Sequence, residues 1–159
     1  MVFPLPNDYL LFADDIAYGR DDALIFEGVT LPLGEGEVVH ITGPNGCGKT
    51  TLIKIITTIL APTQGAVFYK GQLVNDVRYQ YLSELLYIGH KAAVKLSLNA
   101  RENLSWMAAA DGLAGNEIIL EALDIMGIDS ESALSSCGHL SAGQLRRVAL
   151  SRLVFTEKK

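Results

Sequence analysis

Apolar residues in the first half of the chain fall into short runs separated by glycine, proline and acidic residues. Runs of this kind, bounded by turn-forming residues, are typical of strands. They occupy residues 9–13, 23–33, 37–42, 66–70 and 85–88. The acidic pair Asp14 and Asp15 is expected to form a turn after the first run. The run at 85–88 is continuously apolar, which favours a parallel strand buried on both faces.

Helical patterns alternate with these strands and then dominate the second half of the chain. A polar helix is expected near residues 76–83. Asn99 and Glu102 have the spacing of a capping box, which predicts a helix that continues through Trp106 and Met107. A further helix is predicted over 117–126, with its apolar side formed by Ile118, Ile119, Leu123 and Met126. The alternation of strands and helices predicts an α/β fold.

A glycine-rich loop lies between the run at 37–42 and a strongly apolar helix. It has the complete pattern G-x-x-x-x-G-K-T and consists of Gly43, Pro44, Asn45, Gly46, Cys47, Gly48, Lys49, Thr50 and Thr51. Glycines allow several backbone N–H groups to point at one phosphate chain, and the start of a helix attracts the same anion. Lys49 would contact the outer phosphates, and Thr50 would be a ligand of Mg²⁺. The sequence therefore predicts a P-loop that binds a nucleotide with Mg²⁺.

Length and composition fit one globular domain. The chain has 159 residues, of which 49% are hydrophobic, and its net charge is −5. An acidic chain has no basic surface for nucleic acid, so we expect none as a partner. Neither a secretory signal nor an apolar run long enough for a membrane span is recognisable, which predicts a soluble, cytosolic chain. Two cysteines, Cys47 and Cys137, fit a reducing compartment.

A second informative stretch begins at Leu140. Ser141 and Gln144 have capping-box spacing, and the helix that follows has an apolar stripe of Leu145, Val148, Ala149 and Leu153. The stretch Ser141, Ala142, Gly143, Gln144, followed by Leu-Arg-Arg-Val-Ala-Leu, resembles the signature motif of ATP-binding-cassette ATPases, with alanine at the position where glycine is commonest. The resemblance implies ATP as the nucleotide. It also implies a head-to-tail dimer, in which Ser141 and Gly143 contact the ATP of a second ATPase subunit.

The same resemblance assigns roles to two further residues. Tyr18, 25 residues before Gly43, matches the aromatic residue on which the family stacks adenine. A role in surface packing is equally compatible with the sequence. His90 occupies the position where the family has a glutamine that touches Mg²⁺ and the attacking water. Imidazole is a poorer Mg²⁺ ligand than an amide oxygen, so a water-mediated role and a solvated histidine both stay open.

A narrower resemblance rests on the residues around His90, together with Lys95, Leu98, Glu102-Asn103-Leu104 and the signature helix. In these the chain looks like the ATPase subunits of cytochrome c maturation haem exporters. This implies integral membrane transporter subunits as partners, a peripheral location on the cytoplasmic face of the bacterial cytoplasmic membrane, and ATP use coupled to haem handling.

Family members continue into an apolar strand ending in Asp-Glu, and residues 1–159 contain no such strand after Arg152. We therefore expect residues 1–159 to be a partial nucleotide-binding domain, incomplete at its C-terminus, with an antiparallel β layer at its N-terminus and a helical subdomain at about 98–140. The catalytic base is absent from this stretch and stays unknown. Three hypotheses follow: a transporter ATPase subunit, an ATP-binding module without hydrolysis of its own, and a different P-loop enzyme such as a small-molecule kinase. The signature motif favours the first over the third.

Overall fold

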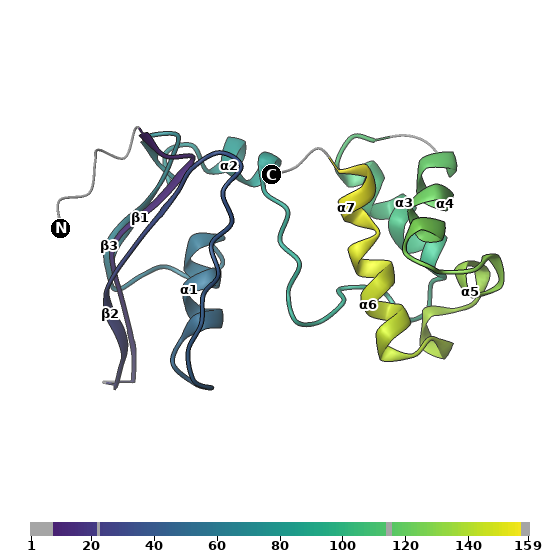
Figure 1. Ribbon diagram of the computed structural model, residues 1–159, viewed down its shortest axis with the longest axis horizontal. Helices are drawn as coiled ribbons and strands as arrows, with labels where there is room; N and C mark the ends of the chain where they lie inside the picture. Colours follow the sequence, from purple (N-terminus) through teal and green to yellow (C-terminus); the bar gives the residue numbers. More distant parts are fainter. Residues whose placement is uncertain (1–7, 22, 114–115, 157–159) are drawn as a thin grey trace. The chain divides into compact units, whose positions relative to one another are not determined.

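The computed structural model describes residues 8–21, 23–113 and 116–156, which belong to two compact units (Figure 1). The first unit spans Met1–Leu85, and among its described residues are strands β1 to β4 and helices α1 and α2. The second spans Leu86–Lys159 and is helical. Each unit has its own hydrophobic core. The phosphate loop therefore belongs to the first unit and the signature stretch to the second.

A four-stranded antiparallel sheet with the order β2-β1-β3-β4 forms the first unit. The strands are β1 (Leu11–Arg20), β2 (Ala23–Leu33), β3 (Gln64–Tyr69) and β4 (Gln72–Leu73). Leu52 and Ile55 of the helix α1 (Lys49–Ile56) share one core with Ile16 and Val67 of the sheet. Helix α2 (Arg78–Glu84) contributes Tyr81 to that core and confirms the polar helix expected nearby. The runs at 23–33 and 66–70 are confirmed as strands.

The turn predicted at Asp14 and Asp15 is wrong, because β1 continues through both residues. The pairing of β1 with β2 shifts between Ala13 and Ile16, and Asp15 has a φ of 46°, as in a β-bulge. Hydrogen bonds hold this bulge: the Asp15 amide donates to Thr30 Oγ1 over 3.2 Å, and Gln64 Nε2 donates to Asp15 Oδ2 over 2.8 Å. The acidic residues thus form a bulge within one long strand, and Tyr18 lies on the part of β1 that follows this bulge.

Two predicted strands, at 37–42 and 85–88, are absent from the described structure. Both segments run without regular secondary structure, and Val38 and Val39 are exposed, Val38 by 93%. A strand is stable only when its backbone groups pair with a neighbouring strand. Neither segment has such a partner among the described residues, and the sheet that does form is antiparallel throughout.

The second unit is built from short helices. They are α3 (Ala100–Ala110), α4 (Asn116–Ile125), α5 (Ser130–Leu134), α6 (Ala142–Leu150) and α7 (Arg152–Phe155), with a 3-10 turn at Cys137–His139. The capping box of Asn99 and Glu102 at the start of α3 is confirmed. Asn103, 97% buried, accepts a hydrogen bond from the Lys95 amide over 2.7 Å and donates to the Lys95 carbonyl over 3.0 Å. This side chain attaches the segment before α3 to the helix.

Two apolar assignments in this unit are wrong. Ile118 is 40% exposed, and α4 instead buries Ile119, Ala122 and Leu123. Leu153 is 58% exposed; it lies on α7, which follows α6 after the single residue Ser151. Val148 and Ala149 of α6 are buried as expected.

Candidate functional site

The phosphate loop leads from the extended segment at 37–42 into α1. Gly48 is the N-cap of α1, with φ 95° and ψ 5°, a conformation that side chains rarely adopt. A Cβ at Gly48 would lie 2.6 Å from Phe26 Cδ1, and one at Gly43 would lie 2.8 Å from Cys47 Sγ. No side chain of the described residues caps this helix start. The N–H groups of the first turn therefore stay available to an anion.

An open pocket of about 290 Å³ lies at this helix start. It is lined by Ile25, Asn45, Gly46, Gly48, Lys49, Thr50 and Thr51, a set that we call the nucleotide cradle. Among these described lining residues there is one cation and no carboxylate. The polar side chains are an ammonium, two hydroxyls and an amide, a combination that suits phosphate oxygens.

The Lys49 ammonium lies folded over the loop. It donates to the carbonyl oxygens of Gly43 and Pro44, each over 2.7 Å, and lies 3.9 Å from Cys47 Sγ. An ammonium has three protons: two stabilise the loop through short hydrogen bonds, and the third makes only a long contact with the Cys47 thiol, which a phosphate oxygen would replace as a better acceptor. Lys49 thus orders the loop and presents positive charge at the same place.

Tyr18 lies on β1 opposite Phe26 on β2, and the two ring centroids are 6.5 Å apart at an interplanar angle of 35°. Phe26 also lies against Gly48, so the same ring is next to both Tyr18 and the loop. The sequence did not single out Ile25 and Phe26, since their apolar character marks them only as residues of a strand. Their contact with the loop joins residues more than twenty positions apart, for which a single sequence gives no signal.

Few side chains of the cradle could bind a metal ion. Thr50 is exposed at the start of α1, so its hydroxyl can serve as one oxygen ligand. The described residues contain no cluster of three or more His, Cys, Asp or Glu that would hold a metal ion by itself. Mg²⁺ commonly binds through one or two protein ligands together with the phosphates of a nucleotide. The cradle therefore fits Mg²⁺ that arrives with a nucleotide.

The signature residues form the start of α6 in the second unit. Ser141 Oγ accepts a hydrogen bond from the Gln144 amide over 3.2 Å, and Gln144 Oε1 accepts one from the Ser141 amide over 2.9 Å. Gln144 Nε2 also lies 3.4 Å from Ser132 Oγ. Gln144 is therefore used within the unit, whereas Ser141, Ala142 and Gly143 are exposed. A Cβ built on Gly143 meets nothing closer than Ser141 Oγ at 4.0 Å.

His90 is exposed and lies in the second unit. The carbonyl of the preceding Gly89 accepts a hydrogen bond from Arg146 Nη1 of α6 over 2.6 Å. The structure thus groups the phosphate loop with Tyr18 in one unit and His90 with the signature residues in the other. Sequence reasoning used Arg146 only as part of the signature pattern and missed its contact with the residue beside His90.

Comparisons with known proteins agree on one family. A family model described as ABC transporter matches residues 26–159. The cytochrome c biogenesis ATP-binding export protein CcmA of Hahella chejuensis is 42% identical over 145 residues, which cover 91% of this chain and 68% of that protein.

Solved structures show the same fold. A putative ABC transporter ATP-binding protein from Pyrococcus furiosus superposes with a TM-score of 0.78 at 29% identity, over 90% of this chain and 68% of that one. A dimeric ATP-binding cassette bound to ADP and Pi gives a TM-score of 0.78 at 24% identity, over 92% of this chain and 69% of that one. The second likeness supports the fold alone.

Proposed function

The chain belongs to the ABC transporter family, and from this membership we propose that the nucleotide cradle binds Mg-ATP for a transporter of the cytochrome c maturation type. As an ATP-binding subunit, the chain resembles CcmA. The observation that carries the proposal is the cradle itself: an uncapped helix start with one ammonium and two hydroxyls, and no carboxylate among its described lining residues.

The phosphate loop and the two strands beside it have separate roles in this proposal. Lys49 and the backbone amides of the loop hold the phosphates, with charge-assisted hydrogen bonds the strongest among them. Thr50 gives one oxygen to Mg²⁺, and the bound metal would neutralise charge on the phosphates. Tyr18 stacks on adenine, with Phe26 behind it as a support. Residues 43–51 thus bind the phosphates and metal, while β1 and β2 supply the base site.

The exposed start of α6 serves a second subunit. Ser141 and Gly143 are free to meet the terminal phosphate of ATP held by a partner's phosphate loop, in a head-to-tail dimer. The small side chain of Ala142 leaves the start of α6 accessible to a partner. Gln144 fixes the conformation of this helix start through the capping box with Ser141. Two ATP sites would then be shared between two chains.

His90 is proposed to act through water rather than as a direct Mg²⁺ ligand. Its exposed imidazole and its position beside the Arg146-bound Gly89 suit a group that responds to the state of the signature helix. The residue that would act as the catalytic base is not identified in residues 1–159.

The transport context follows from the likeness to a protein named for export in cytochrome c biogenesis. We propose that integral membrane subunits are the partners, that haem handling is the coupled process, and that the subunit sits peripherally on the cytoplasmic face of the membrane. No helix in the described ranges has the length and hydropathy to cross a bilayer. Residues 1–159 would make a partial nucleotide-binding domain whose helical subdomain occupies about 98–140.

Substitution of Lys49 tests the proposal. In Lys49→Ala, the loss of a charge-assisted contact of about 1.5–3 kcal/mol should weaken ATP binding roughly ten- to hundredfold, as measured by isothermal titration in the presence of Mg²⁺. Lys54→Ala is the matched control, because Lys54 is an exposed lysine of the same helix outside the cradle. Equal ATP affinity in the two variants would overturn the assignment of the cradle.

A further inference from the structure

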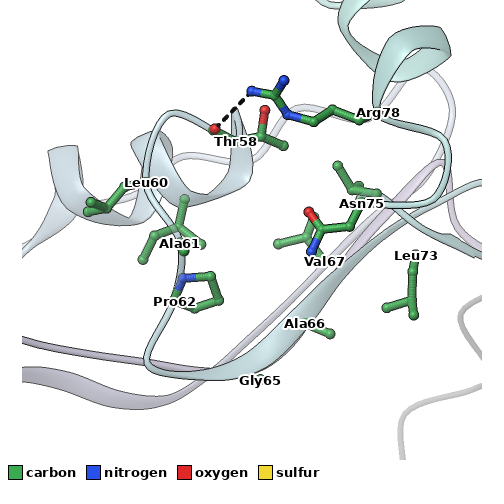
Figure 2. Close-up of a pocket in the computed structure, with 12 residues that line it drawn as sticks. Thr58, Leu60, Ala61, Pro62, Gly65, Ala66, Val67, Leu73, Asn75 and Arg78 are labelled. Atoms are coloured by element: carbon green, nitrogen blue, oxygen red, sulfur yellow. Dashed lines mark hydrogen bonds between the residues drawn. The ribbon is translucent and has the colours of Figure 1, made fainter.

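A second pocket of the first unit shares no residue with the nucleotide cradle (Figure 2). It has a volume of about 160 Å³ and lies between the end of α1, the start of β3 and the segment that joins β4 to α2. Its lining combines apolar side chains with three polar ones, Thr58, Asn75 and Arg78. The family resemblance and the motifs assign no role to these three residues.

Thr58 is the unusual residue of this pocket. Its hydroxyl oxygen is buried and has no hydrogen-bond partner in the described structure. Its backbone φ of 57° belongs to the cap that ends α1, where the Thr58 amide donates to the Ile55 carbonyl over 3.0 Å and the Ile59 amide donates to the Lys54 carbonyl over 2.9 Å. A buried hydroxyl without a partner costs free energy. This cost would be offset by a ligand that accepts a hydrogen bond from the Thr58 hydroxyl.

Arg78 and Asn75 supply further donors. Figure 2 shows the Arg78 guanidinium at the same end of the pocket as Thr58, where Arg78 Nη2 donates to the Thr58 carbonyl over 3.5 Å. A contact of this length is weak, so the exposed guanidinium is available to a better acceptor. The Asn75 amide forms no hydrogen bond within the described chain. Three residues with donor groups therefore line one pocket, and none of its described lining residues is acidic.

The rest of the lining is apolar, with Leu60, Pro62, Val67 and Leu73 among its members. We propose that this pocket binds a small organic acid whose carboxylate meets Arg78, Thr58 and Asn75 and whose short apolar chain covers the aliphatic side chains. A carboxylate matches the fork of a guanidinium, which can donate two parallel hydrogen bonds to it. A bare inorganic anion would leave the apolar part of the pocket uncovered. The volume is below the range usual for drug-sized ligands, so the acid has only a few carbon atoms.

Isovalerate is a suitable probe, with isovaleramide as its uncharged counterpart of the same shape. In an amide-resolved NMR titration of the whole chain, isovalerate should shift the signals of Thr58, Leu73 and Arg78 with a dissociation constant in roughly the millimolar range, as expected for so few heavy atoms. Isovaleramide should bind at least about tenfold more weakly, since it lacks the charge that Arg78 recognises. Equal binding of the acid and the amide would overturn the proposal, as would the absence of saturable shifts at these residues.

Two variants separate recognition from folding. Arg78→Gln should weaken isovalerate binding about tenfold or more, whereas Arg20→Gln, which removes an exposed arginine elsewhere in the same unit, should leave it unchanged. Thr58→Val removes the hydroxyl but keeps the side-chain shape. It should weaken binding without lowering the melting temperature, because it replaces an unpartnered buried hydroxyl with a methyl group. Unchanged isovalerate affinity in both Arg78→Gln and Thr58→Val would show that these groups form no acid site.

Discussion

Tyr18 shows how the role of a single residue depends on the residues behind it. Its ring lies beside Phe26, and Phe26 fills the space that any side chain at Gly48 would need. A base stacked on Tyr18 would therefore lie beside a ring that packs against the start of α1. This arrangement restricts where adenine can lie when the phosphates are held by the loop.

Substitution of Tyr18 should separate base binding from phosphate binding. Stacking of a base on an aromatic ring is worth about 1–3 kcal/mol, so Tyr18→Ala should weaken ATP binding roughly five- to hundredfold, and Tyr18→Phe should bind almost as the unaltered chain does. Tripolyphosphate, which has no base, provides the control, and its affinity should not change in Tyr18→Ala. A parallel loss for both ligands would mean that Tyr18 acts by supporting the loop and does not stack on adenine.

The sequence identifies some residues of the cradle and not others, for a physical reason. Lys49 and Thr50 belong to a motif whose chemistry is contained in nine consecutive residues, so one sequence suffices to predict them. Ile25 and Phe26 line the same loop through a contact between distant parts of the chain. Such contacts depend on how β2 packs, which the pattern of apolar residues does not specify.

At the level of helices and strands, Glu84 at the end of α2 interacts with Tyr69 and Lys70 at the end of β3. Its carboxylate accepts a hydrogen bond from the hydroxyl of Tyr69 and forms an ion pair with Lys70 over 2.9 Å. The hydrogen bond from Tyr69, and next the one from Lys70, lower the pKa of Glu84 from 4.5 to about 2. Tyr69 also packs against Tyr81, whose hydroxyl donates to the Ile56 carbonyl at the end of α1 over 2.9 Å. These contacts connect α1, β3 and α2.

The lowered pKa of Glu84 predicts how the stability of the first unit depends on pH. Because the pKa is lower in the folded state, the carboxylate stabilises that state above pH 4.5, and this contribution is lost as the pH falls from about 4.5 to about 2. Glu84→Gln should therefore be less stable than the unaltered chain at neutral pH, with the difference shrinking across that range. Urea unfolding at several pH values measures it. Glu27→Gln is the control, since Glu27 is exposed and its side chain has no partner in the described chain. A loss of unfolding free energy in Glu84→Gln that does not change with pH would contradict the prediction.

The elements that the sequence predicts well are those with local signals. The capping boxes at Asn99 and Ser141 are made by residues three positions apart, and both are present as expected. Strands depend instead on partners that the local pattern does not contain. The segments at 37–42 and 85–88 have strand-like composition but no paired neighbour among the described residues, and the acidic residues of β1 form a bulge because Thr30 and Gln64 hold Asp15 in place.

At the scale of the whole molecule, the two halves of the proposed ATP site lie in different units of one chain. Gly143→Arg tests whether the signature residues act on a second subunit, because the position is exposed and leaves room for a side chain. We expect this variant to bind ATP normally and to lose ATP-dependent dimerisation in sedimentation velocity, because a bulky side chain would block the close approach. Ala142→Gly is the control: it introduces the residue that is commonest at this position of the signature motif, and it should dimerise normally. Unimpaired dimerisation of Gly143→Arg would refute the head-to-tail arrangement.

The central claim is that residues 43–51 hold the phosphates of Mg-ATP. The most direct measurement is an amide-resolved NMR titration of the whole chain with Mg-ATP, repeated on Lys49→Ala. We expect saturable shifts that are largest for the loop and the first turn of α1 and small for the pocket around Thr58 and Arg78. In Lys49→Ala these shifts should require a much higher Mg-ATP concentration. Two results together would show that the loop does not bind the phosphates: the largest saturable shifts lie outside residues 43–51, and these shifts are unchanged in Lys49→Ala.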